Sequence, residues 1–118
     1  MLTNSAQLAT RRFKQILEEL QMAIITDCSP EELQSIRQIA QNHFQGTLMQ
    51  IPQEEWDADD NTPVQPFLTE THRQLRLLTM DMQFLQASRQ ASTTQQRLAQ
   101  IKQRIATLIE YCDQIQLG

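Results

Sequence analysis

The fold is decided by residues 66–91, which read PFLTETHRQLRLLTMDMQFLQASRQA. At about 100° per residue, the apolar side chains of a helix over this stretch gather in two stripes on opposite sides. The first stripe consists of Leu68, Thr71, Leu75, Leu78, Met82 and Leu85. The second stripe consists of Leu77, Met80, Phe84, Ala87 and Ala91. A helix on the outside of a small bundle needs one apolar stripe, so the second must meet either more of this chain or another molecule.

Two helices are predicted ahead of this stretch. The first runs from about Ser5 to Thr26, where apolar residues recur at intervals of three and four. The second begins at SPEE, residues 29–32, because serine suits an N-cap, proline the first helical position and glutamate a capping box. Its expected buried face comprises Leu33, Ile36, Ile39, Ala40 and Phe44, with Leu48 at its end. Pro52 is expected to stop this helix, because the residue before a proline avoids helical geometry.

A last helix is predicted directly after the stretch. The helix from near Pro66 to Gln90 is followed by STTQ, residues 92–95, which has the form of a capping box. No glycine separates the two helices, so a tight helical hairpin is expected. Apolar residues then recur at heptad spacing, at Leu98, Ile101, Ile105, Leu108, Cys112 and Ile115.

The long connection lies between Ile51 and Gln65, where the helical periodicity disappears. It holds five acidic residues among residues 54–60, with Trp56 between them. With short joins elsewhere, this pattern predicts an all-α antiparallel four-helix bundle with a longer acidic loop between helices two and three, in a single helical domain over residues 1–118. A three-helix arrangement is the alternative, with the second helix packed apart or with the last two helices forming one long hairpin arm.

Composition and charge set the class of protein. The 118 residues include only two glycines and four prolines, which agrees with a chain that is nearly all helix. The net charge of −4 gives no electrostatic reason to bind nucleic acid or an anionic membrane. No apolar run is long enough to span a bilayer or to serve as a secretory signal, so we expect a cytoplasmic protein without membrane insertion. Cys28 and Cys112 are expected to remain thiols.

Candidate metal and catalytic residues do not form a constellation. Asp57, Asp59 and Asn61 resemble the opening of a calcium loop, but Thr62 replaces the turn glycine and Leu68 replaces the closing glutamate. We therefore expect no metal site, no cofactor and no enzymatic activity.

The sequence contains two histidines, His43 and His72. His72 on a helix of a small bundle invites comparison with histidine phosphotransfer domains, although the lysine and small residue that follow the active histidine there are missing. A phosphorelay protein using His72 remains the alternative function. His43 has no second ligand nearby and no Glu-x-x-His pair exists, so a di-iron site has no support.

Two segments are candidate contacts for a protein partner. One is the second stripe, at Leu77, Met80, Phe84 and Ala87, because methionine and phenylalanine suit adaptable binding surfaces. It is either packed within this chain or used as a contact, in a homodimer or with a different partner. The other is the acidic loop, at Glu54, Glu55, Trp56 and Asp57. The tryptophan either covers the end of the core or docks a partner.

Several short segments in the second half of the chain resemble the PatD family of cyanobacterial heterocyst-frequency control proteins. They are ETHR at residues 70–73, MDMQFLQASRQ at 80–90, TTQQR at 93–97 and IEYC at 109–112. Length, glutamine content and helical layout agree over the whole chain. The resemblance implies a cytoplasmic regulator that binds the tubulin-like division GTPase FtsZ, modulates its assembly, and so influences cell division and heterocyst frequency. It transfers no binding residue position by position.

Overall fold

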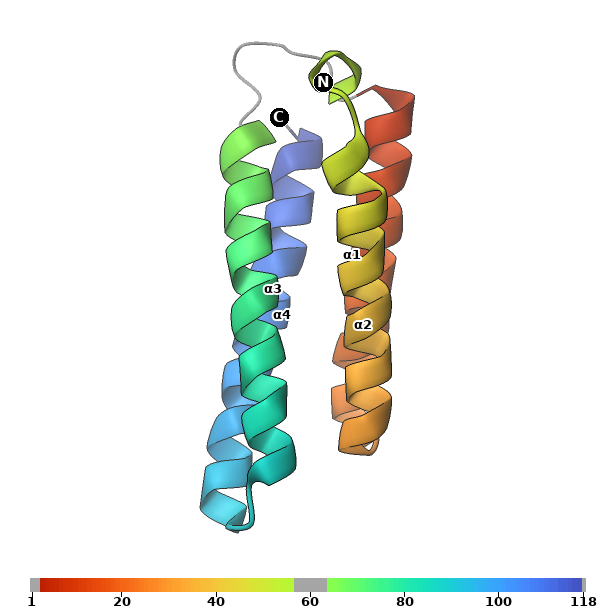
Figure 1. Ribbon diagram of the computed structural model, residues 1–118. Helices are drawn as coiled ribbons and strands as arrows, with labels where there is room; N and C mark the ends of the chain where they lie inside the picture. The colour runs from red at the N-terminus through yellow and green to blue at the C-terminus, as the bar shows by residue number, and fades with distance from the viewer. Residues whose placement is uncertain (1–2, 57–63, 118) are drawn as a thin grey trace.

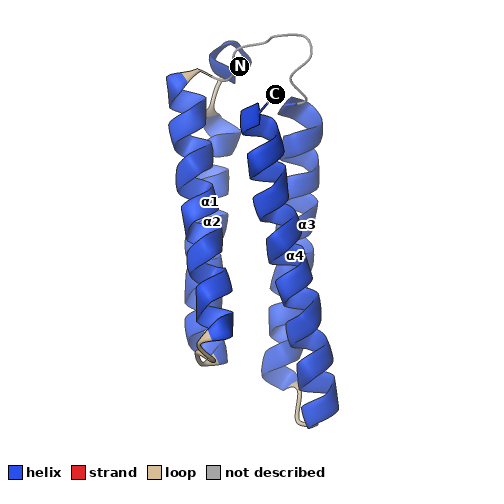
Figure 2. Ribbon diagram, turned by 180° about the vertical axis from the view of Figure 1, so that it is seen from behind, coloured by secondary structure: helices blue, strands red, loops and turns tan. Residues whose placement is uncertain are grey.

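Four long helices form the protein in the computed structural model, which describes residues 3–56 and 64–117 (Figure 1). The helices are α1 (Asn4–Ile25), α2 (Pro30–Gly46), α3 (Val64–Ala87) and α4 (Ala91–Leu117). Two short 3-10 helices, η1 (Leu48–Gln50) and η2 (Gln53–Trp56), lie between α2 and α3. Successive long helices run antiparallel, α1 and α3 each pack against both α2 and α4, and Figure 2 shows helix throughout the described elements. The predicted all-α four-helix bundle is confirmed, as is the longer connection between its second and third helices.

The join between α1 and α2 is built by local hydrogen bonds. Asp27 has a left-handed φ of 58°, and the amide of Cys28 donates to the carbonyl of Ala23 at 3.0 Å, which closes the end of α1. The hydroxyl of Ser29 then accepts a hydrogen bond from the amide of Glu32 at 3.2 Å, with Pro30 in the first turn of α2. The predicted start of the second helix is therefore confirmed.

The predicted end of the second helix is wrong. α2 ends at Gly46, ahead of Pro52, because Thr47 leaves helical geometry at φ −123° and ψ −62°. The chain turns into η1, which brings Leu48 to full burial over the end of the core. The expected burial of Ile39 is also wrong, since that side chain is 50% exposed.

The α3–α4 hairpin also differs from the prediction at its ends. α3 begins at Val64, ahead of Pro66, and ends at Ala87 rather than Gln90. α4 begins at Ala91, and the amide and hydroxyl of Thr94 both donate to the carbonyl of Gln90, at 2.9 and 3.0 Å. Gln90 rather than Ser92 therefore stands at the start of α4.

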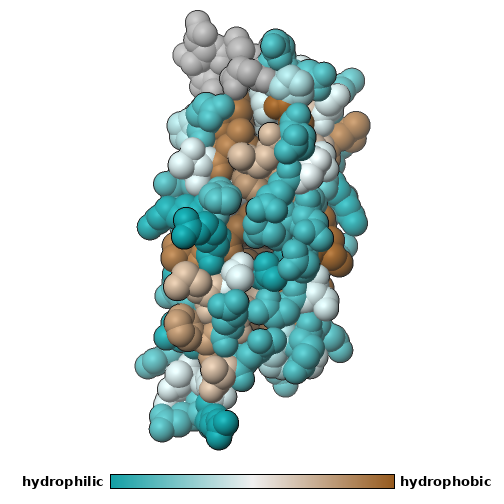
Figure 3. All heavy atoms as spheres, in the orientation of Figure 1, coloured by the Kyte–Doolittle hydropathy of each residue, from teal (hydrophilic) through white to brown (hydrophobic). Residues whose placement is uncertain are grey.

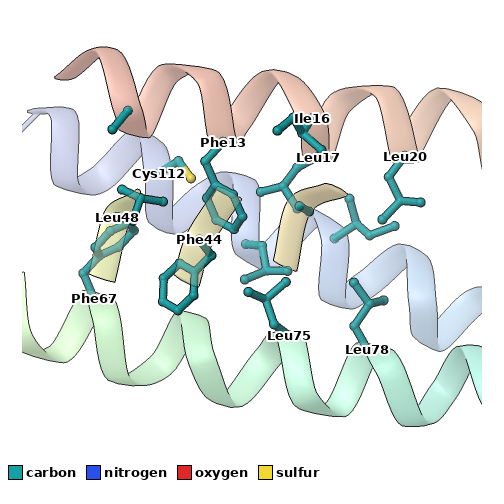
Figure 4. Packing of buried hydrophobic residues seen from close by; sticks show 14 of the residues in the cluster. Phe13, Ile16, Leu17, Leu20, Phe44, Leu48, Phe67, Leu75, Leu78 and Cys112 are labelled. Carbon is teal, nitrogen blue, oxygen red and sulfur yellow. The ribbon is translucent and has the colours of Figure 1, made fainter. Parts of the chain in front are cut away.

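The core runs along the axis between the four helices. Figure 4 shows buried side chains from each helix pointing into it, including Phe13 of α1, Phe44 of α2, Leu75 of α3 and Cys112 of α4. The rings of Phe13 and Phe44 lie 5.7 Å apart between centroids. The first stripe is buried except for the half-buried Leu68, and the heptad residues of the last helix are buried except for the half-buried Leu98. Both apolar faces therefore lie in one core, where α3 packs against α4.

Trp56 closes one end of this core. Its side chain is 1% exposed, and its ring meets Phe67 of α3 edge to face, with 6.2 Å between ring centroids. The hydroxyl of Thr3 donates to the carbonyl of Glu55 and accepts from the amide of Ala6, so the start of α1 holds η2 in place. Trp56 is thus part of the core.

The two helical hairpins differ in length. α3 and α4 have 24 and 27 residues, whereas α2 has only 17. Figures 1 and 2 show the α3–α4 turn projecting beyond the α1–α2 turn, at the end of the molecule opposite the chain termini.

Candidate functional site

The second stripe lies on the outer side of α3, away from the core. Met80 and Phe84 are each 48% exposed, Ala87 is exposed, and Leu77 is half-buried. Figure 3 shows brown and tan atoms gathered on the lower half of α3, bordered by hydrophilic ones. Ala91, the last member of the stripe, is exposed at the start of α4. The second stripe is therefore not packed against the first two helices within the core.

A buried ion-pair cluster supports one edge of the second stripe. Asp81 of α3 is 5% exposed and accepts a hydrogen bond from Nε of Arg104, on α4. Its other carboxylate oxygen lies 3.7 Å from Nη1 of Arg97. The guanidinium of Arg97 in turn lies over the ring of Phe84, with Cζ 4.6 Å from the centroid, which is a cation–π geometry. The exposed ring of Phe84 thus contacts Arg97, which also lies beside the buried carboxylate of Asp81 between α3 and α4.

Arginines also line the other edge of the second stripe. Arg73 and Arg76 form a recess with Leu77 and Met80. A larger recess of about 460 Å³ lies between α2 and α3, and the residues that line it include Arg37, Arg76 and Met80. The candidate surface therefore combines two exposed large apolar side chains with the arginines that line the recesses beside them.

Arg37 is the least expected member of this surface. Its side chain is on the buried face of α2, and the residue is only 9% exposed. Its guanidinium donates to side-chain oxygens of Gln34 at 2.6 Å, Gln38 at 3.0 Å and Thr79 at 3.2 Å, all of them neutral. Burial lowers the pKa of Arg37, because a desolvated cation is disfavoured.

The sequence held a signal for this arginine that our prediction missed. The buried residues of α2 are Leu33, Arg37, Ala40 and Phe44, whose spacing is that of one helical stripe. Arg37 therefore occupies an inward position, whereas the predicted buried face contains only apolar residues. Asp81, by contrast, pairs with arginines of another helix, α4. Such a pair depends on the register between α3 and α4, which cannot be predicted from the spacing of residues along one helix.

The acidic segment does not join the second stripe. Glu54 and Glu55 are exposed on η2, at the end of the molecule near the termini, away from the lower half of α3 (Figure 1). Trp56, which the sequence placed among the candidate contacts, is instead buried, so its ring is not available to a partner. Asp57 lies outside the described residues. The two predicted contact segments therefore form separate surfaces.

The histidines take structural positions. His72 is half-buried and its ring stacks on Phe44, with 6.4 Å between centroids. His43 lies with Nε2 2.9 Å from the carbonyl oxygen of Ala9 and stacks on Phe13. Both rings thus pack against core aromatics.

The remaining candidate groups do not converge on a site. Over residues 3–56 and 64–117, no cluster of three or more His, Cys, Asp or Glu side chains is arranged to hold a metal ion. The calcium-like residues Asp57, Asp59 and Asn61 lie outside this part of the chain. Cys28 and Cys112 are both free, and burial raises the pKa of Cys112 to about 12, with a smaller contribution from the neighbouring Asp113. No helix in the described ranges is long and apolar enough to cross a membrane.

Comparison with known proteins places the chain by one match. No curated protein and no solved structure shows significant similarity to it. A family model described as the CRR41 C-terminal domain matches residues 13–112, from the middle of α1 to near the end of α4. That range includes the core, the second stripe and the arginines beside it, and the chain belongs to the CRR41 C-terminal domain family.

Proposed function

We propose that this protein is a non-enzymatic cytoplasmic regulator that acts by binding another protein through the second stripe. The observation that carries the proposal is the outward exposure of Met80 and Phe84, each 48% exposed on a helix whose opposite side is buried. A contiguous apolar patch rimmed by polar groups is typical of an interaction site on a soluble protein. Methionine, aromatic residues and arginine are also the types enriched where proteins meet.

The proposed partner is the division GTPase FtsZ, whose assembly this protein would modulate, with effects on cell division and heterocyst frequency. The support for this partner is the resemblance of residues 70–97 and 109–112 to the PatD family. The family model that matches the chain has a different description, so that resemblance is the whole support for FtsZ. The binding surface rests on the exposed stripe and does not depend on the partner's identity.

Co-sedimentation with FtsZ filaments tests both parts. We expect the wild type to pellet with filaments, and Phe84→Asp and Met80→Asp to stay in the supernatant while keeping the helical circular dichroism and the melting temperature of the wild type. Leu8→Asp is the matched control, because Leu8 is 62% exposed on α1 and lies outside the second stripe. It should pellet like the wild type.

Each departure from this result has a distinct meaning. A wild type that does not pellet removes FtsZ as the partner. If Phe84→Asp pellets as well as Leu8→Asp, the contact lies elsewhere. Sedimentation velocity over a wide concentration range tests whether a second copy of this chain binds to the second stripe. Self-association lost in Phe84→Asp would show that the stripe is a homodimer interface.

A further inference from the structure

Arg37 is a buried cation at the edge of the second stripe, and no carboxylate of residues 3–56 or 64–117 forms an ion pair with it. Burying a guanidinium has a large desolvation cost, which proteins usually offset with an ion pair. Arg37 has three neutral hydrogen-bond acceptors instead, on Gln34, Gln38 and Thr79. In the same fold, the two arginines on the α4 side share the carboxylate of Asp81. Among the described residues, the α2 side of α3 therefore has the cation of such a pair without the acid.

The geometry around Arg37 leaves room for that acid. Arg37 and Arg76 come from different helices and line one recess of about 460 Å³, with Thr79 and Met80 beside them. Arg76 is exposed, whereas the nearby Arg73 already pairs with Glu70 at 3.3 Å. A carboxylate in the recess would lie beside the largely buried Arg37 and the exposed Arg76, since both residues line it. Charge-assisted hydrogen bonds are strongest in such a place.

We infer that this recess receives an aspartate or glutamate side chain of the protein partner, whose neighbouring apolar side chains cover Met80 and Phe84. The inference rests on the proposed function and adds the chemistry of the partner. Met80 belongs both to the recess and to the second stripe, so one segment of a partner reaches both. The partner segment is thus an acidic, amphipathic one.

Charge and apolar content favour a protein segment over nucleic acid. A phosphate backbone requires cations along its whole length, and this chain has a net charge of −4. Large apolar side chains between the arginines match apolar side chains of a partner, not a sugar–phosphate chain. Electrostatic complementarity of this kind sets which partner binds as well as how fast.

Panning a display library of random peptides against the full chain tests this chemistry without an identified partner. We expect the selected peptides to combine Asp or Glu with large apolar residues. One selected peptide, and its twin with Gln for Glu or Asn for Asp, are then titrated against the wild type, Arg76→Gln, Arg37→Gln and Phe84→Asp. The twin should bind the wild type at least about tenfold more weakly than the acidic peptide, which is the weight of one charge-assisted hydrogen bond. Arg76→Gln should remove that difference, and because Arg76 is exposed, this variant reports on binding even if Arg37→Gln fails to fold.

The contrary outcomes separate this inference from the proposed function. If peptides without acids are enriched, and Phe84→Asp abolishes their binding, the second stripe binds proteins but the recess does not read a carboxylate. If no peptide is enriched, or if an oligonucleotide binds in an Arg76-dependent manner, the acidic segment is excluded. Co-sedimentation with FtsZ then decides the proposed function on its own.

Discussion

Replacing Asp81 with alanine is expected to destabilise the protein strongly, because it leaves Arg104 desolvated without its counter-ion. The Asp81 side chain is 7% exposed and that of Arg104 is 18% exposed. Removing one partner of a buried ion pair costs about 3–5 kcal/mol of unfolding free energy. Water still reaches part of Arg104, and Gln74 still accepts from its Nη1 at 3.3 Å, so we expect the lower end of that range, about 3 kcal/mol.

Urea unfolding followed by circular dichroism measures this cost. The single variants Asp81→Ala and Arg104→Ala and the double variant form a cycle, in which the double variant should lose less than the sum of the singles. Arg73→Ala is the matched control, because Arg73 pairs with Glu70 on the exposed side of α3, with side chains 61% and 46% exposed. Such a surface pair is worth less than about 1 kcal/mol.

Two outcomes would refute the reasoning. If Asp81→Ala costs no more than Arg73→Ala, the cluster is not desolvated and α3 does not meet α4 in the register described. If the losses of the cycle are additive, Asp81 and Arg104 do not interact. A positive result carries a second consequence: Arg97 loses its carboxylate in Asp81→Ala, so its cation–π contact with Phe84 is weakened as well.

Three further variants test the ends of the bundle and its interior. Trp56→Ala should lower the unfolding free energy by about 3–5 kcal/mol, because it opens a cavity at the end of the core. Trp56 is the sole tryptophan, so the fluorescence emission of the wild type should shift to the red on unfolding. An unshifted emission would mean that the ring is already in water in the folded protein. Cys112 has a pKa near 12 in the folded protein against an ordinary 9.0, so the unfolded thiol loses its proton first and stability should fall above pH 9.0, by at most about 1.4 kcal/mol per pH unit. Cys112→Ala should lack that part of the fall, and at pH 8 a thiol reagent should label Cys28 well before Cys112. Asp27→Gly should raise the melting temperature by removing the cost of a left-handed φ of 58°, and a lower one would mean that the aspartate side chain stabilises the turn.

Periodicity along single helices predicted most of the fold. The first stripe and the heptad residues of the last helix were identified as buried faces because each is a property of one helix, and Ser29 with Pro30 marked a helix start by local chemistry. The end of α2 was not predictable in the same way. The helix ends before Thr47, and Leu48 in η1 is buried. The burial of Leu48 depends on the positions of η1 and Trp56 over the core, which are set by the tertiary structure.

Only part of the candidate site could be predicted from the sequence. The spacing of Met80 and Phe84 places them opposite the first stripe in any helix over these residues, independently of the tertiary structure. That they face outward depends on which helices flank α3, and this is a property of the assembled bundle. The arginines at the two edges belong to different helices, α2 for Arg37 and α4 for Arg97, so their meeting with α3 depends on interhelical register.

The unequal length of the two hairpins implies a gradient of local stability along the molecule. No residue of α4 before Ile101 is buried, and the turn at residues 88–90 projects past the other hairpin (Figures 1 and 2). Amide hydrogens around this turn should therefore exchange through local opening, while those near Phe13 and Leu75 exchange only through global unfolding. A partner seated on Phe84 would join the two helices close to the segment that opens most readily. Slowed exchange at that end is then a direct, residue-resolved signature of the bound state.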